Sequence, residues 1–244
     1  MGEDYQLDND LINVAKVIDF TKESVRDEIR AKSTSEKDNS DEENQLSQMQ
    51  AVDTNGHGTF IAGVIGSTHP DCPGIAPEAE IYILKLFTDD DLTYTSWFLD
   101  AFNYVLEHDI DVVNLSTASK DSQDIPFIEK IEELTANGVI IISAIGNDGP
   151  SFGSPESPGE LAVALGVGSL HLNLEDVADF SARGMTTKNL LDGIGLLKPD
   201  LVAPGSSIKG LSLTTGECEL KSGTSVSAAV MSGSVALVLS SMGD

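Results

Sequence analysis

The chain has 244 residues, 40% of them hydrophobic, with 22 glycines and a formal net charge of −26 from 40 acidic and 14 basic residues. This length and composition fit one globular domain with a sizeable core. The negative charge excludes nucleic acid and anionic lipid as partners and favours basic ligands. No apolar run approaches the roughly 20 residues that span a bilayer, so we expect no direct membrane insertion by this chain.

The two least apolar stretches are predicted to lie outside the core. Residues 1–10, "MGEDYQLDND", form an acidic tail that does not fit a signal peptide, and residues 11–244 are expected to form one domain. Within it, residues 28–50 are charged and polar, which indicates an acidic surface excursion or a mobile loop. Cys72 and Cys218 fit no zinc spacing; they either pair in an oxidising compartment or remain free and buried.

The periodicity of apolar residues predicts alternating strands and helices between residues 11 and 170. In chain order we expect a strand over 11–20, a helix over 56–66, a strand over 80–87, a helix over 95–109, a strand over 110–116, a helix over 125–138, and strands over 139–146 and 161–170. Loops and a hairpin are expected over 171–223, before a helix that follows Ser225. Such alternation predicts right-handed βαβ units and a parallel sheet.

Four polar residues fall where a parallel sheet gathers active groups, at the carboxyl ends of its strands. Asp19 ends the first strand, His57 lies between two glycines, Asn147 follows a strand, and Ser225 opens the last helix. Each also has a structural interpretation: Ser225 as a helix cap, Asn147 as a turn former. Asp53 is an alternative carboxylate for His57, although a turn or cap role suits it better. No such setting surrounds the other histidines, which we expect to be structural or exposed: His69, His108 and His171.

Asp, His and Ser in this order match one of the chain orders in which the serine hydrolase triad occurs. In that chemistry the serine attacks a carbonyl, the histidine moves its proton, and the carboxylate orients the imidazole. An amide such as that of Asn147, together with the backbone N–H of Ser225, meets the oxyanion.

Three blocks carry a resemblance to subtilisin-like serine proteases, the subtilases: "DTNGHGTFIAGVIG", "AIGNDGP" and "SGTSVSAA". They are similar to the family's signatures around the catalytic histidine, the oxyanion asparagine and the nucleophilic serine. Further stretches, such as "SWFLDAFNYVLEHDIDVVNLS" and "DFSARGMTT", resemble the site-1 protease group. The resemblance implies an α/β three-layer sandwich with a mostly parallel central sheet. It also implies a serine endopeptidase of the secretory pathway that needs no cofactor for its chemistry.

The resemblance also suggests how a substrate is bound. It places Asp89, Asp90 and Asp91 on the groove rim, where they would attract an arginine of a protein or peptide substrate. Ser116, Thr117 and Ala118 would line the groove, and their side chains would favour an aliphatic residue at the cut, as in Arg-x-x-Leu. The acidic run has no spacing typical of a calcium site, so structural calcium is not indicated. The chain's own propeptide, which the family usually needs to fold, is a further expected partner.

Two departures from the family pattern favour an alternative function. Phe20 and Thr21 follow Asp19 where the family has Ser or Thr and then Gly, and Thr117 and Ala118 follow Ser116 where glycines are usual. The alternative is a catalytically inactive relative that keeps the groove and binds peptides or partners.

Overall fold

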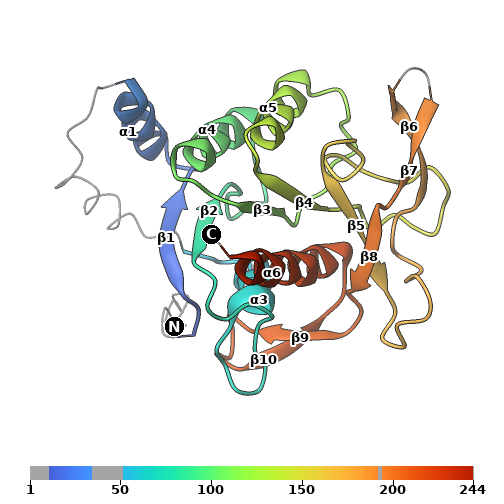
Figure 1. The fold of residues 1–244 in the computed structure, drawn as a ribbon. Coiled ribbons are helices and arrows are strands. Elements are labelled where there is room, and N and C mark those ends of the chain that lie inside the picture. The colour runs from blue at the N-terminus through green and yellow to red at the C-terminus, as the bar shows by residue number, and fades with distance from the viewer. Residues whose placement is uncertain (1–10, 35–51, 192–193, 244) are drawn as a thin grey trace.

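The structure of the chain is a computed structural model that describes residues 11–34, 52–191 and 194–243 (Figure 1). Up to residue 170 the elements in chain order are β1 (Val14–Asp19), α1 (Glu23–Thr34), α3 (His57–Gly66), β2 (Ile81–Lys85), α4 (Thr95–Glu107), β3 (Val112–Leu115), α5 (Ile125–Ala136), β4 (Ile140–Ala144) and β5 (Leu165–Leu170). After residue 170 they are β6 (Gly184–Leu191), β7 (Ile194–Lys198), β8 (Leu201–Pro204), β9 (Ile208–Leu211), β10 (Cys218–Lys221) and α6 (Thr224–Met242).

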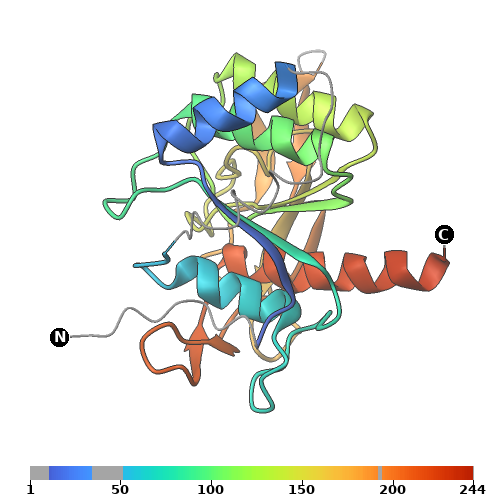
Figure 2. The ribbon, with the colours of Figure 1, turned by 90° about the vertical axis from the view of Figure 1, so that its left-hand side faces the viewer.

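A four-stranded parallel sheet forms the centre of the fold, in the order β3-β4-β5-β8. Helices α4 and α5 lie on one side of this sheet, and α3 and α6 lie on the other (Figure 1 and Figure 2). Helices are needed on both sides because the strands of a parallel sheet bury both faces. The predicted three-layer α/β sandwich with a mostly parallel sheet is confirmed.

Each face of the sheet has its own apolar cluster. Under α4 and α5, aromatic rings meet edge to face, with the centroids of Phe98 and Phe127 5.3 Å apart. Under α6 the contacts are small, and Ala228 packs against Ile142 and Val167. Small side chains let α6 lie close to the strands, which places its first turn at the carboxyl end of the sheet.

Helix α6 is more apolar than the sequence analysis recognised. Over its 19 residues it is long and apolar enough to cross a membrane, the one such helix in the described ranges. Serines and a glycine interrupt the run of apolar residues in α6. One of these serines, Ser232, is nevertheless buried, and its Oγ donates a hydrogen bond to the carbonyl of Ala228 at 2.9 Å. The first half of α6 packs on the sheet, whereas Leu237, Val238 and Met242 near its end are exposed.

The strand expected over residues 11–20 does not join the central sheet. β1 pairs in parallel with β2, from Val14 opposite Ile81 to Asp19 opposite Lys85. Among the described residues no strand ladder links this pair to β3. The expected sheet is therefore divided, and a cleft lies at the division.

Two predicted boundaries were wrong. Helix α1 continues to Thr34, so it overlaps the excursion expected over 28–50; the rest of that excursion and the tail at 1–10 lie outside the described residues. The strand expected over 161–170 begins only at Leu165. Before it, the carbonyls of Leu161 and Ala164 accept hydrogen bonds from the buried Lys198 ammonium, at 2.7 and 3.0 Å.

The stretch 171–223 is more ordered than predicted. It contains two antiparallel hairpins, β6–β7 and β9–β10, where one was expected. It also contains β8, the fourth strand of the central sheet, which is only four residues long and ends in a proline. A strand this short shows no apolar alternation, and its place depends on distant pairing with β5.

Candidate active site

Ser225 lies in the first turn of α6, at the carboxyl end of the sheet. Its carbonyl accepts a hydrogen bond from the Ser116 hydroxyl at 2.9 Å, and Ser116 Oγ accepts from the Asn114 amide at 2.8 Å. The residue that caps α6 is Gly223, which has no side chain. In the described part of the chain the Ser225 hydroxyl makes no capping bond, so the capping interpretation of Ser225 is not supported.

Asn147 is tied to the start of the same helix. Its Oδ1 accepts hydrogen bonds from the backbone N–H of Thr224 at 2.9 Å and from the Thr224 hydroxyl at 3.0 Å. Because these bonds occupy Oδ1, the amide NH₂ is the end left to act as a donor. Asn147 is exposed, but its side chain is oriented by these two bonds, unlike that of a simple turn former.

The Ser225 hydroxyl and the Asn147 side-chain amide both lie close to Gly223. A Cβ atom on Gly223 would lie 3.2 Å from Ser225 Oγ and 3.8 Å from Asn147 Nδ2. One point in space is thus within reach of both a hydroxyl and an amide donor. A carbonyl group placed there would meet a nucleophile and an oxyanion donor together.

His57 is the first residue of α3, and Asp53 holds the turn before it. Gly56 has a φ of 83°, a left-handed conformation that suits glycine. Asp53 accepts hydrogen bonds from the N–H groups of Asn55 at 3.0 Å and Gly56 at 2.8 Å, and from Thr59 at 2.7 and 2.8 Å. Partial burial opposes ionisation of Asp53, but these bonds outweigh it and lower the pKa of the carboxyl. The cap role expected for Asp53 is confirmed.

The imidazole of His57 is exposed on the cleft, with protein on several sides. The loss of hydration lowers the pKa of His57 first, and the nearby positive charge of Lys221 lowers it further; Asp53 and Asp91 oppose the shift. The lowered pKa favours the neutral form of His57. A neutral imidazole is the form that accepts a proton.

Asp19 has its own local partners. The side chain is buried, with 4% of its surface exposed. Its Oδ1 accepts hydrogen bonds from the N–H of Thr21 at 3.1 Å and the hydroxyl of Thr21 at 2.5 Å, and its Oδ2 lies 3.3 Å from the Lys22 ammonium. In the described part of the chain no hydrogen bond joins His57 to Asp19 or to Ser225. The orienting role of Asp19 stays a prediction.

A cavity of about 690 Å³ lies at the division of the sheet. Its walls come from β1, β2, the start of α3 and the end of β3, and include His57, Ser116, Thr117 and Asp91. A second cavity of about 350 Å³ is lined by Thr117 and Ala118 together with three phenylalanines: Phe87, Phe98 and Phe127. Thr117 therefore lines both cavities, and Ala118 lines the second one.

The three rim aspartates differ in their surroundings, although all are exposed. Asp91 lines the larger cavity. Asp89 accepts from the Thr54 hydroxyl at 2.8 Å and pairs with the Lys85 ammonium at 3.2 Å, and these two contacts lower the pKa of Asp89. Asp90 does not line either cavity. Of these three aspartates, Asp91 is thus the one best placed to meet a ligand in the cleft.

Sequence reasoning missed two residues of this site. Thr224 binds Asn147, and the threonine beside the serine in "SGTSVSAA" was a signal that could have been used. Lys221 acts on His57 across the fold, and nothing in the sequence predicted that proximity.

A model of the subtilase family matches residues 8–244, so the chain belongs to the subtilase family. This family is that of the subtilisin-like serine proteases. The chain is 49% identical over 188 residues to the subtilisin-like protease SBT6.1 of Arabidopsis thaliana. It is also 49% identical over 187 residues to the membrane-bound transcription factor site-1 protease of Homo sapiens. Each alignment covers 77% of this chain and 18% of the relative. The expected resemblance to the site-1 protease group is confirmed.

The fold agrees with that of solved subtilases. The crystal structure of a cold adapted subtilisin-like serine proteinase matches with a TM-score of 0.71 at 22% identity, covering 98% of this chain and 73% of that one. This likeness concerns the fold alone. The roles of individual residues depend on the site geometry.

Proposed function

We propose that this chain is the catalytic domain of a serine endopeptidase in which Asp19, His57 and Ser225 form the triad and Asn147 supplies the oxyanion donor. The observation that carries the proposal is that one point beside Gly223 lies 3.2 Å from Ser225 Oγ and 3.8 Å from Asn147 Nδ2. The family membership supports the same chemistry.

In the proposed reaction, Ser225 Oγ bonds to the carbonyl carbon of the substrate as its proton passes to His57. The negative oxygen is held by Asn147 Nδ2 and the backbone N–H of Ser225. His57 then gives the proton to the leaving amine as the C–N bond breaks, and water releases the acyl group in a second round of the same steps. The carboxylate of Asp19 orients the imidazole, which requires it to exchange its bonds with Thr21 and Lys22 for one with His57.

The proposed substrate is a protein or peptide with arginine several residues before the cut and an aliphatic residue at it. Asp91 in the larger cavity and the net charge of −26 favour a basic side chain there. We propose that the chain works in the secretory pathway. A disulfide between Cys72 and Cys218 fits an oxidising compartment, and the name of the human relative refers to a membrane-bound transcription factor.

Replacing Asn147 tests the oxyanion role. We expect Asn147→Ala to lower kcat by about 10²–10³-fold with little change in KM, because the amide meets charge that develops in the transition state. Asn147→Asp is the matched control for structure, since it keeps an acceptor for Thr224 but loses the NH₂ donor. If Asn147→Asp retains full kcat, Asn147 acts only by holding α6.

The pH dependence tests His57. Because its pKa is lowered, the acid limb of kcat/KM should lie below the pKa of free histidine, and the rate should rise with pH as His57 loses its proton. Lys221→Met removes the charge but keeps an aliphatic chain over the Phe60 ring, so we expect the limb to move to higher pH. Lys209→Met, on the same hairpin, is the control. An unmoved limb in Lys221→Met would show that another group controls it.

Peptide selectivity tests the acidic rim. With matched peptides that differ only in arginine or norleucine four residues before the cut, Asp91→Asn should reduce the preference for arginine about two- to fivefold at low salt. Using the ratio of the two peptides cancels any effect on His57. Asp89→Asn should change the ratio less, because Asp89 is already paired with Lys85. Equal ratios in Asp91→Asn and wild type would exclude Asp91 from arginine binding.

The second candidate function is peptide binding without cleavage. The bonds of Asp19 to Thr21 and Lys22 favour it, because they occupy the carboxylate that the triad needs. Incubating the purified chain with an Arg-x-x-Leu peptide library and detecting new termini by mass spectrometry separates the two functions. Cleavage that Ser225→Ala abolishes supports the protease; saturable binding of uncut peptide supports the alternative.

A further inference from the structure

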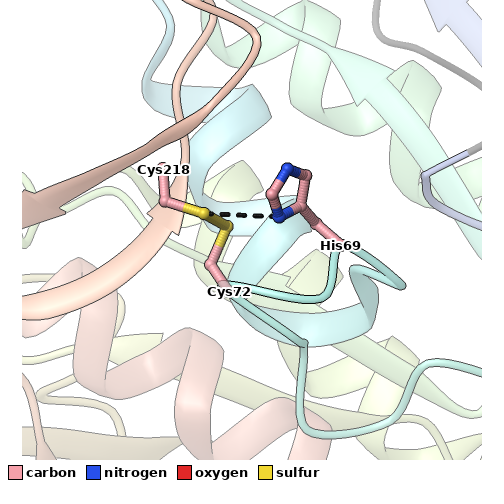
Figure 3. A group of neighbouring side chains, drawn as sticks. All are labelled: His69, Cys72 and Cys218. Atoms are coloured by element: carbon pink, nitrogen blue, oxygen red, sulfur yellow. Dashed lines mark hydrogen bonds between the residues drawn. A yellow bond between two sulfur atoms is a disulfide. The ribbon is translucent and has the colours of Figure 1, made fainter.

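A cluster of three metal-ligating side chains lies away from the proposed active site. His69 and Cys72 belong to the loop after α3, and Cys218 begins β10 (Figure 3). The two sulfurs form a disulfide, and the Nδ1 atom of His69 lies 3.5 Å from Cys218 Sγ. One donor atom from each residue lies within 4.8 Å of the other two.

The nitrogen of His69 that faces the sulfurs is Nδ1, and its lone pair is engaged by a backbone N–H group. His69 Nδ1 accepts a hydrogen bond from the N–H of Asp71 at 3.2 Å, so the ring proton belongs on Nε2. Figure 3 shows Nδ1 directed at the sulfurs. Neutral imidazole binds a metal through its unprotonated nitrogen, so a metal at Nδ1 would take the place of the hydrogen bond from Asp71.

We propose that, when the disulfide is reduced, His69, Cys72 and Cys218 form a binding site for a thiolate-preferring divalent cation, Zn²⁺. Zinc bonds of about 2.3 Å to sulfur and about 2.0–2.1 Å to nitrogen place tetrahedral ligands about 3.5–3.8 Å apart. The present separation of Cys218 Sγ and His69 Nδ1 already has that value. The two sulfurs must separate by about 1–2 Å, which side-chain rotation supplies. Two thiolates and one imidazole leave the fourth position to water.

The chemistry balances with a dithiol as reductant. The dithiol gives two electrons and two protons, the bond between the two sulfurs breaks, and the reductant closes into its own disulfide. Zinc then binds two thiolates, and the two thiol protons pass to solvent. In either state the loop after α3 stays joined to β10, by a disulfide when oxidised and by the metal when reduced.

The test uses Co²⁺ as a spectroscopic substitute for Zn²⁺. The chain is reduced with dithiothreitol, freed of reductant under argon, checked for helical signal by circular dichroism, and titrated with Co²⁺. We expect one Co²⁺ per chain with a thiolate-to-cobalt charge-transfer band, displaced by Zn²⁺, and no band in the oxidised chain. Zinc should also raise the thermal unfolding midpoint of the reduced chain.

Variants identify the ligands. His69→Ala should weaken binding about tenfold or more, and Cys72→Ser should abolish the band. His171→Ala, a histidine on a different loop, should bind as wild type does. The proposal is overturned if the reduced chain gives no charge-transfer band, if His69→Ala binds as tightly as wild type, or if reduction removes the helical signal and zinc does not restore it.

Discussion

Replacing Ser225 with alanine should abolish peptide hydrolysis. In serine proteases with this order of triad residues, loss of the nucleophile lowers turnover by about 10⁶-fold. The remaining rate over water should come from the oxyanion donors and substrate binding, which alanine leaves in place. Initial rates with a fluorogenic Arg-x-x-Leu peptide measure the effect.

Ser227→Ala is the control for Ser225→Ala. Ser227 lies two residues further along α6, is buried, and its hydroxyl has no hydrogen-bond partner in the described part of the chain. Its loss should leave the rate within a few-fold of wild type. If Ser225→Ala hydrolysed the peptide as fast as Ser227→Ala, Ser225 would not be the nucleophile.

Replacing Asp19 with asparagine should lower kcat by about 10⁴-fold, because an amide cannot hold His57 in the tautomer and charge state that the reaction needs. This outcome requires that Asp19 leave its bonds with Thr21 and Lys22 when the enzyme is active. Hydrogen bonds of a catalytic group are often loose or misaligned before substrate binds, so the described arrangement is compatible with that exchange.

Asp53→Asn separates the two carboxylates that the sequence offered for His57. The oxygens of Asp53 are used by Asn55, Gly56 and Thr59 at the start of α3. We therefore expect Asp53→Asn to lower stability by about 0.5–2 kcal/mol, as for loss of a helix cap, with a much smaller effect on kcat than Asp19→Asn. The reverse ranking of the two kcat values would assign the orienting role to Asp53.

The part of the site that the sequence predicted is the part built by local geometry. The glycines beside His57 and before Ser225 have roles that a short motif records: Gly56 sets the turn, and at Gly223 a side chain would crowd the Ser225 hydroxyl. The alternation of strands and helices likewise predicted the layers, because each element has its own apolar period.

The parts that were missed depend on long-range packing or on competition between local partners. The bonds of Asp19 depend on whether Thr21 or His57 takes its carboxylate, which no periodicity encodes. His69 contacts Cys218 only because the fold brings together Cys72 and Cys218, which are 146 positions apart in the sequence. β8 was hidden because four residues ending in proline resemble a loop until β5 is beside them.

Covalent labelling of Ser225 tests the central claim most directly. A fluorophosphonate reacts with a serine whose hydroxyl is activated by a working histidine, whatever peptide the enzyme prefers. Intact-mass and peptide-mapping analysis should find one adduct on Ser225 in wild type and in Ser227→Ala, and none in Ser225→Ala or His57→Ala. A folded wild-type chain that carries no adduct on Ser225 after prolonged incubation would contradict the proposed protease and favour the peptide-binding alternative.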